Sequence, residues 1–368
     1  MWSRAFVLTF SFAAIAVPSP AQEATLEGEL APGFKDLIEV SEVLLDVIAT
    51  DADGRVVLGL GEDDFVIEED GEAVEITGVS FYATRYADDL PVAETLAAAA
   101  AEEVPSSRYF ILFWDAQPRD LRYGNLMLRQ HMRASRDLKR WVMEEMSASD
   151  WMAVVRYDGE LAIYQDFTQE SEALVEAIRR AAVGKAPNAF APASRRSGPI
   201  DHLSLARRLP PRDRTGGRED IYRALGRVAE ASGYIVGRKN LLLLTTGFGE
   251  EERHSRSRPH PERYPALETL LNDHNVAVYP IDLTPPGRSP RQRDFLDQLA
   301  RDTGGYYDEN FVGFLNPVKD VAEENYGYYL LSYQSARRLG EIGYQRLEVR
   351  ARDPEIQVRA RTGYRYGL

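Results

Sequence analysis

Two arginine-rich stretches are the clearest candidates for binding chemistry in this sequence. Residues 179–218 carry ten Arg or Lys against two acids, and residues 253–263 add four Arg and two His. Guanidinium groups form paired hydrogen bonds with carboxylates and phosphates, so such stretches favour acidic proteins, polyanionic glycans or phosphate-bearing surfaces. The alternative is a solvated loop without a ligand, since structureless loops beyond about 15 residues are often disordered.

Catalytic motifs are absent. The sequence contains no HExxH, no GxSxG, no GxxxxGK[ST] and no GxGxxG after a strand. Its five histidines are scattered, and the pair Gly304-Gly305 is predicted to precede a short strand, whereas a phosphate loop precedes a helix. Asp282 follows an apolar run, 276–281, and is predicted to cap a loop or helix. A Ser–His–Asp triad stays open, but the sequence favours a protein that is not an enzyme.

Composition narrows the function classes further. The 368 residues predict two or three domains, and 44% hydrophobic residues are enough for packed cores. The net charge of −14 disfavours a general nucleic-acid binder. The sequence has no cysteine, which excludes disulfides, cysteine-ligated metal sites and cysteine nucleophiles.

The first 21 residues have the pattern of a signal peptide. One arginine precedes an apolar run of about 13 residues, and Ser19-Pro20-Ala21 supplies small residues for cleavage. The run is shorter than the ~20 residues of a spanning helix, although an uncleaved anchor is the alternative. We therefore expect a secreted or periplasmic protein with no transmembrane segment after signal removal.

The rest of the chain divides by its hydrophobic pattern. Alternating residues predict a small β-unit at 37–83, too short to be stable alone, between a flexible segment at 22–36 and a linker at 84–106. Residues 107–326 alternate apolar strands with amphipathic helices, which predicts an α/β domain with a doubly wound, mostly parallel sheet. Strands return at 327–368, and we expect them to form a β-sandwich with residues 37–83.

Several segments carry a resemblance to a known family. They are DADGRVVLGLGEDDFVIEEDGEAVEITGVSF (51–81), RYFILFWDA (108–116), GRKNLLLLTTG (237–247), VAVYPIDL (276–283), LARDTGGYYDEN (299–310) and RARTGYRY (359–366). Together they resemble the von Willebrand factor A (VWA)-like proteins of bacteria, in the secreted subgroup with a β-rich N-terminal segment. The resemblance implies a Rossmann-like domain, a site at the carboxyl ends of its strands, and a role in adhesion or assembly.

The resemblance also implies where a metal-ion-dependent adhesion site would lie. That family uses Asp-x-Ser-x-Ser after the first strand, a later Thr and a second Asp, which present oxygen ligands to Mg²⁺. Matching those positions here gives, in chain order, Asp115, Gln117, Arg119, Glu219 and Thr246. Because a guanidinium at position 119 repels a divalent cation, the site is interpreted as degenerate. Arg119 is expected to take the place of the metal and pair with Asp115 or Glu219; otherwise Asp115 merely caps a helix or loop.

These residues lead to one preferred function and two alternatives. The sequence predicts a non-catalytic extracytoplasmic protein that binds a protein or an anionic polymer through Asp115, Gln117, Arg119, Glu219 and Thr246. No cofactor is expected. Mg²⁺ binding is doubtful. If Mg²⁺ binds, its expected ligands are Asp115, Gln117, Glu219 and Thr246. The first alternative is an exported hydrolase that uses Asp115 and Glu219. The second is a structural module of an envelope complex, with contacts made by the β-sandwich.

Overall fold

The structure is a computed structural model that describes most of the chain after residue 37. The described residues are 38–83, 107–117, 124–187, 204–210, 220–251, 257–285, 293–307, 313–338 and 341–367. The chain divides into two compact units, Met1–Leu37 and Ile38–Leu368, and all described residues belong to the second. The predicted signal peptide, the segment 22–36 and the linker 84–106 therefore lie outside the described residues.

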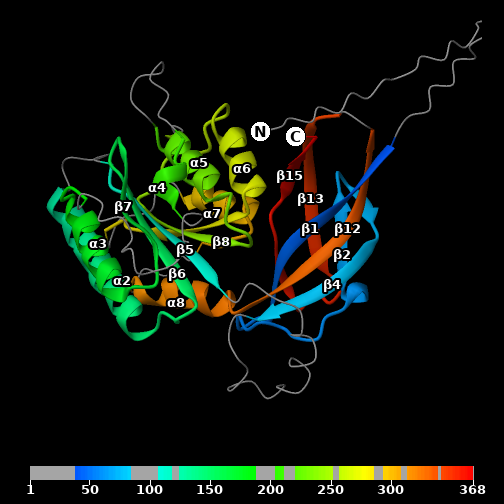
Figure 1. Ribbon diagram of the computed structural model, residues 1–368, viewed down its shortest axis with the longest axis horizontal. Coiled ribbons are helices and arrows are strands. Elements are labelled where there is room, and N and C mark those ends of the chain that lie inside the picture. Colours follow the sequence, from blue (N-terminus) through cyan, green and yellow to red (C-terminus); the bar gives the residue numbers. More distant parts are fainter. Residues whose placement is uncertain are drawn as a thin grey trace, which may run out of the picture. The chain divides into compact units, whose positions relative to one another are not determined.

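A five-stranded sheet forms the centre of the α/β part, in the order β11-β8-β5-β6-β7 (Figure 1). Its strands are β5 (Arg108–Asp115), β6 (Asp150–Tyr157), β7 (Leu161–Thr168), β8 (Lys239–Thr245) and β11 (Val276–Asp282). All neighbours pair in parallel except β6 and β7, which form an antiparallel hairpin. The predicted mostly parallel sheet is confirmed.

Helices cover both faces of this sheet (Figure 1). They are α2 (Gly124–Glu144), α3 (Ser171–Val183), α4 (Leu205–Arg208), α5 (Ile221–Ser232), α6 (Tyr264–Asp273), α7 (Arg293–Asp302) and α8 (Leu315–Glu324). Apolar residues of α5, α6 and α7 pack on one face, and those of α2, α3 and α8 on the other. Each amphipathic helix thus buries its apolar stripe against the sheet.

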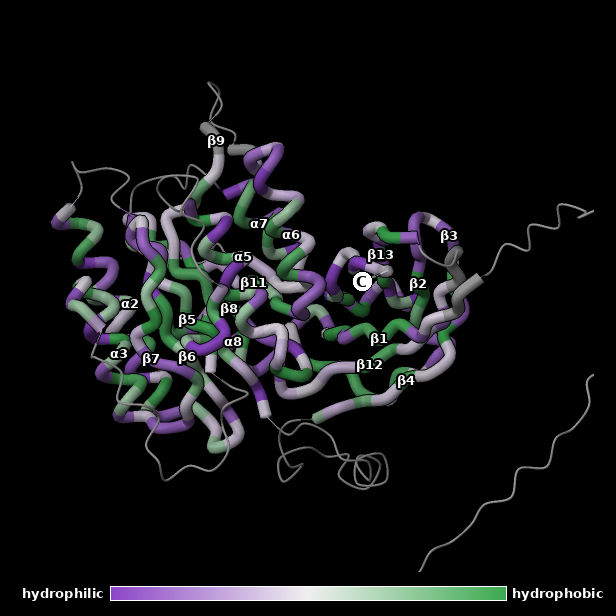
Figure 2. The backbone as a smooth tube through the Cα atoms, turned by 45° about the horizontal axis from the view of Figure 1, so that its top comes forward, coloured by the Kyte–Doolittle hydropathy of each residue, from purple (hydrophilic) through white to green (hydrophobic). Residues whose placement is uncertain are grey.

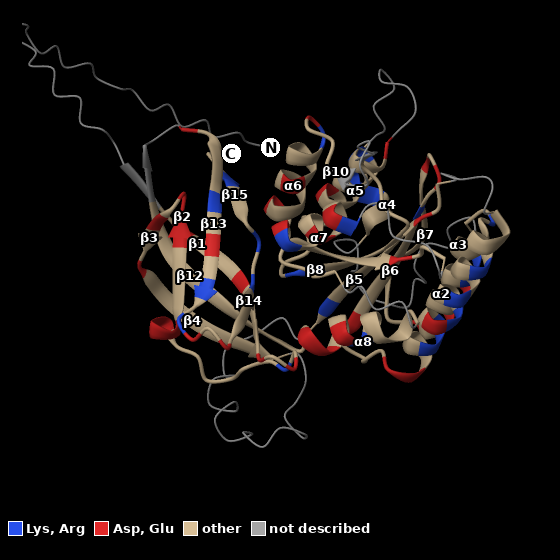
Figure 3. Cartoon of the chain, turned by 180° about the vertical axis from the view of Figure 1, so that it is seen from behind, with Lys and Arg blue, Asp and Glu red and all other residues tan. Residues whose placement is uncertain are grey.

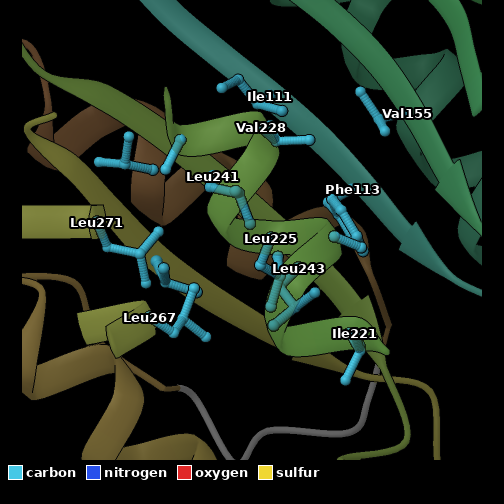
Figure 4. Close-up of a cluster of buried hydrophobic side chains, with 14 of the residues drawn as sticks. Ile111, Phe113, Val155, Ile221, Leu225, Val228, Leu241, Leu243, Leu267 and Leu271 are labelled. Carbon is cyan, nitrogen blue, oxygen red and sulfur yellow. The ribbon is translucent and has the colours of Figure 1, made fainter. Parts of the chain in front are cut away.

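The pleat of the strands divides the core into two clusters. Ile111 and Phe113 of β5 point to the cluster with α5 and α6 (Figure 4), and Phe110, Leu112 and Trp114 point to the opposite cluster. Because successive side chains in a strand point to opposite faces, only a continuous apolar run fills both clusters. Figure 2 shows the resulting hydrophobic centre of the α/β part.

A β-sandwich is built from both ends of the described chain. One sheet has the order β14-β1-β12-β4, and the other has the order β15-β13-β2-β3. The strands are β1 (Ile38–Thr50), β2 (Phe65–Glu69), β3 (Glu72–Val74), β4 (Ile76–Ala83), β12 (Gly327–Arg338), β13 (Gly343–Ala351), β14 (Gln357–Arg359) and β15 (Gly363–Tyr366). β1 pairs with β12 and β2 with β13, so the predicted joining of N- and C-terminal strands is observed. Their inner faces share one apolar core.

Three short elements complete the described chain. They are the 3₁₀ turn η1 (Glu62–Asp64) and the paired strands β9 (Glu250–Glu251) and β10 (Ser257–Arg258).

The Gly304-Gly305 pair is a packing feature in this fold. A Cβ at Gly305 would lie 2.0 Å from the carbonyl oxygen of Val278 in β11, and Gly304 adopts a φ of +76° beside the backbone of Ala360. Glycine is required at both positions because any side chain would clash or be strained. The pair therefore lets the turn after α7 approach both the central sheet and the C-terminal segment.

Candidate functional site

Three polar side chains end neighbouring strands at the carboxyl edge of the central sheet. Asp115 ends β5, Thr245 ends β8 and Asp282 ends β11, and Thr245 lies directly opposite Asp282 in the parallel register. All three are buried. The chain continues from β5 to β6 on one side and from β8 to β11 on the other, so β5 and β8 flank the point where the winding reverses. In doubly wound sheets, ligands bind at the carboxyl ends of strands at this point.

The carboxylate of Asp115 is held by hydrogen bonds from two side chains. The hydroxyl of Thr245 donates to Oδ2 at 2.6 Å, and the side-chain amide of Gln117 donates to Oδ1 at 3.2 Å. The same Thr245 oxygen accepts a hydrogen bond from the backbone N–H of Gly247 at 2.9 Å. Both oxygens of Asp115 are therefore engaged by protein donors.

Asp282 is satisfied in a similar way. Its Oδ1 accepts the backbone N–H of Thr284 at 2.6 Å, and its Oδ2 accepts the hydroxyl of Tyr307 at 3.2 Å. Burial raises the pKa of this carboxyl, and the hydrogen bonds from Thr284 and Tyr307 oppose the rise. The loop-capping role expected for Asp282 agrees with this geometry.

The structure brings together some of the residues that the sequence singled out. Asp115 and Gln117 are in contact, whereas Arg119 and Glu219 lie outside the described residues. The hydroxyl that contacts Asp115 belongs to Thr245. The predicted site residue was its neighbour Thr246, whose side chain is half-buried. Trp114 of β5 lies opposite Leu244 of β8, so Asp115 and Thr245 follow at the same level. Because successive side chains alternate between the two faces of the sheet, Thr245 shares the face of Asp115 and Thr246 does not.

His131 is a buried residue to which sequence reasoning gave no role. It lies on α2, and its Nδ1 accepts a hydrogen bond from the indole N–H of Trp114 at 2.7 Å. Burial lowers the pKa of His131 to about 4, with a smaller effect from Arg156, so the imidazole is neutral at pH 7. It fixes the end of β5 directly before Asp115. The sequence signal that could have indicated its burial is its position on the apolar face of the helix that became α2.

The described part of the chain contains three of the candidate Mg²⁺ ligands, Asp115, Gln117 and Thr246, whereas Glu219 lies outside it. No three His, Cys, Asp or Glu side chains among the described residues are placed to hold a metal ion. Mg²⁺ requires six oxygen ligands with accessible lone pairs in octahedral geometry. The oxygens of Asp115 and the hydroxyl of Thr245 instead accept hydrogen bonds from the protein.

The described arginines of the basic stretches do not gather on one face. Arg263 pairs with Asp220 at 3.1 Å, and Asp220 caps the start of α5, which lies at the carboxyl edge. Arg208 of α4 instead stacks on Tyr234 at 3.8 Å, between the end of α5 and the start of β8. That position is at the amino ends of the strands. The part of the first basic stretch that forms α4 therefore lies away from the carboxyl edge.

Asp166 explains the position of α4. This residue of β7 accepts hydrogen bonds from the hydroxyl of Ser204 at 2.6 Å and the backbone N–H of Leu205 at 2.7 Å. β7 runs antiparallel to β6, so its end lies at the amino edge of the sheet.

Basic and acidic side chains are interspersed along α2 and α3 (Figure 3).

We expect Thr245→Val to lower the free energy of unfolding by about 1–3 kcal/mol, because it removes a hydrogen bond to a buried carboxylate and the acceptor of the Gly247 N–H. Thr246→Val is the matched control, and we expect it to change stability by less than about 0.5 kcal/mol. Urea unfolding of both variants checks this. Equal losses would show that Thr245 has no special role at Asp115.

Comparisons with known proteins give structural likenesses only. No family model and no curated protein matches the chain. Similar solved structures include BatB from Bacteroides thetaiotaomicron (12% identity, 59% of this chain and 98% of that chain, TM-score 0.36). Others are manganese-loaded TRAP from Plasmodium vivax (9%, 77% and 95%, 0.35) and the vWF domain of the pilus tip protein Mfa5 from Porphyromonas gingivalis (13%, 40% and 46%, 0.25).

These scores are too low to support any statement about activity, and the match spans less than half of the Mfa5 chain. The fold class is instead shown by the strand order and direction in this structure. None of the helices in the described ranges is long and apolar enough to cross a membrane. The chain has the architecture that the sequence resemblance implied, a mostly parallel sheet between two helical layers.

Proposed function

We propose that this chain is a non-catalytic binding protein of the extracytoplasmic space, which recognises a protein or an anionic ligand at the carboxyl edge of the central sheet. The observation that carries the proposal is the position of Asp115 and Thr245 at the switch point between β5 and β8. A rigid sheet with helices on both faces is a scaffold on which the loops at this edge can vary. The export signal expected at 1–21 supplies the location.

We further propose that binding at this edge does not depend on a divalent cation. The carboxylate of Asp115 already accepts hydrogen bonds on both oxygens, and these bonds reduce the electron density that its oxygens can offer to a metal. Arg119, expected to take the place of the metal, would supply positive charge without a cation. Cation-independent binding is what a degenerate adhesion site would show.

The metal question has a direct test. We expect calorimetric titration with Mg²⁺, Mn²⁺ and Ca²⁺ to give no binding heat, and the melting temperature to stay within about 1 °C at millimolar cation. A cation with micromolar Kd would stabilise the folded state by several kcal/mol at that concentration. Micromolar binding that disappears in Asp115→Ala would overturn the proposal, and Asp297→Ala, an exposed carboxylate on α7, is the control.

The binding role itself is tested with a polyanion probe. We expect fluorescent poly-L-glutamate to bind with an affinity that falls as salt rises, because screening weakens contacts with exposed arginines. Arg263→Gln at the carboxyl edge should weaken this binding, whereas Arg350→Gln, an exposed arginine of the β-sandwich, should not. Equal loss in both variants would favour the alternative in which the sandwich makes the contacts. No observation in the described residues favours the hydrolase alternative.

A further inference from the structure

A cavity of about 620 Å³ opens at the opposite edge of the central sheet, where β8 begins. It lies between the end of α5, helix α6 and the segment around β15. The residues that matter for its chemistry are Glu230, Tyr234, Leu270, Arg361 and Tyr364. Its volume falls in the range of about 300–1,000 Å³ that is typical of small-molecule sites. Since β8 runs from Lys239 to Thr245, this cavity is separate from the edge that holds Asp115.

Two of the charged side chains at the cavity, Asp273 and Arg365, form an ion pair with each other. The side chain of Asp273 accepts the backbone N–H of Arg365 on Oδ1 at 2.8 Å and pairs with its guanidinium on Oδ2 at 3.2 Å. Asp273 and Arg365 therefore neutralise each other. The remaining charged side chains in the cavity wall are Arg361 and Glu230.

Arg361 is the cation available to a ligand. It is half-buried, and its two terminal nitrogens donate to neutral carbonyl oxygens, those of Asn272 at 3.0 Å and Leu44 at 2.9 Å. Its Nε is buried without a hydrogen-bond partner. Carboxylates near the guanidinium, Asp46 and Asp273, act on it only through their charge. A guanidinium held by carbonyls keeps capacity for an anion, and a planar carboxylate suits its geometry.

The other walls are apolar or aromatic. Tyr234 is 63% exposed, and Leu270 and Tyr364 contribute further apolar surface. Leu44, whose carbonyl binds Arg361, is itself 52% exposed. Apolar surface beside an oriented guanidinium is typical of a small-molecule site. The exposed carboxylate of Glu230 is also part of the wall, and it disfavours a ligand with two negative charges.

We propose that this cavity binds a small organic monocarboxylate whose aromatic or aliphatic body packs against Tyr234 and Leu270, with the carboxylate at Arg361. The site is independent of the proposed binding edge at Asp115. Its ligand differs from a phosphate ester in carrying one charge on a planar group next to an apolar body.

Three probes with the same phenyl body isolate the headgroup chemistry. The purified protein is titrated by calorimetry with 3-phenylpropionate, 3-phenylpropanamide and 3-phenylpropylamine, each to about 10 mM. We expect the carboxylate to bind at least about tenfold more tightly than the amide or the amine, which corresponds to 1.4 kcal/mol. Equal binding of the amine or the amide, or no binding of the carboxylate at this concentration, overturns the proposal.

Variants at the cavity wall then assign the contacts. We expect Tyr234→Ala to weaken binding of the carboxylate about fivefold and Glu230→Gln to strengthen it about twofold, because a like charge is removed. Val236→Ala, an exposed residue outside the cavity wall, should leave the affinity unchanged. Arg361→Gln should abolish binding. If that variant does not fold, Tyr234→Ala and Glu230→Gln decide, and an unchanged affinity in both contradicts the proposed site.

Discussion

Replacing Asp150 by alanine is expected to lower the free energy of unfolding by about 3–5 kcal/mol. Arg108 and Asp150 are the first residues of β5 and β6 and lie directly opposite each other. Two nearly parallel hydrogen bonds of 2.6 and 2.7 Å join the guanidinium to the carboxylate, and both side chains are almost fully buried. Removing the carboxylate leaves an uncompensated buried cation.

Further contacts make this loss difficult to repair. Arg108 also donates to the carbonyl of Ala322 at 2.5 Å and lies over the ring of Tyr326 at 4.4 Å, so it cannot turn toward solvent. Asp150 additionally accepts the backbone N–H of Ser147 at 2.8 Å. The pair therefore ties the starts of two central strands to the end of α8.

Urea unfolding of Asp150→Ala measures this loss against a matched surface pair. Asp297 and Arg301 on α7 are 2.7 Å apart, nearly the same distance, but both are exposed. We expect Asp297→Ala to change stability by less than about 1 kcal/mol, because solvent screens the exposed pair. Similar losses in both variants would contradict the role assigned to burial.

The second large effect is a rise in stability between about pH 7 and pH 9. Lys239 is almost fully buried at the start of β8, and its ammonium donates to the carbonyls of Ile235 and Gly237, each at 2.9 Å. Burial lowers the pKa of Lys239 from 10.5 to about 7, against the opposing charge of Asp46. The unfolded chain therefore binds the proton more tightly in this window, so stability grows as pH rises and is lost as pH falls toward 7.

The magnitude is about 2–3 kcal/mol across these two pH units, since each unit of pKa difference corresponds to 1.36 kcal/mol. The neutral His131 and the raised pKa of Glu324, about 7 because of burial, change stability mainly below pH 7. Buried tyrosines with raised pKa values, such as Tyr344 at about 12, lower stability from about pH 9 upward, because tyrosines in the unfolded chain lose their protons near pH 10.

Urea unfolding at pH 7, 8 and 9 checks this prediction. Lys239→Met should flatten the rise, whereas Lys185→Met, at an exposed lysine, should keep it. A wild-type protein whose stability is constant over this range would show that the carbonyl contacts of Lys239 fully offset its burial.

The sequence alone determined the main elements and their arrangement. Continuous apolar runs at 109–114, 241–245 and 276–281 predicted strands buried on both faces, and alternating patterns at both chain ends predicted the strands of the sandwich. These features follow from local periodicity, because the side-chain direction of a strand or helix is fixed by its own backbone. The candidate edge followed from the same pattern, since Asp115 closes the first of these runs.

Only the tertiary structure decided which side chains meet. Thr245, and not its neighbour Thr246, contacts Asp115, because the end of β8 and its register with β5 set which hydroxyl faces the carboxylate. The pairing of Arg108 with Asp150, 42 positions apart, likewise depends on strand register. Lys239 lies in a polar stretch of sequence and is buried only by the folding of distant segments around it. Local patterns carry no information on such contacts, because they arise from the packing of elements far apart in the chain.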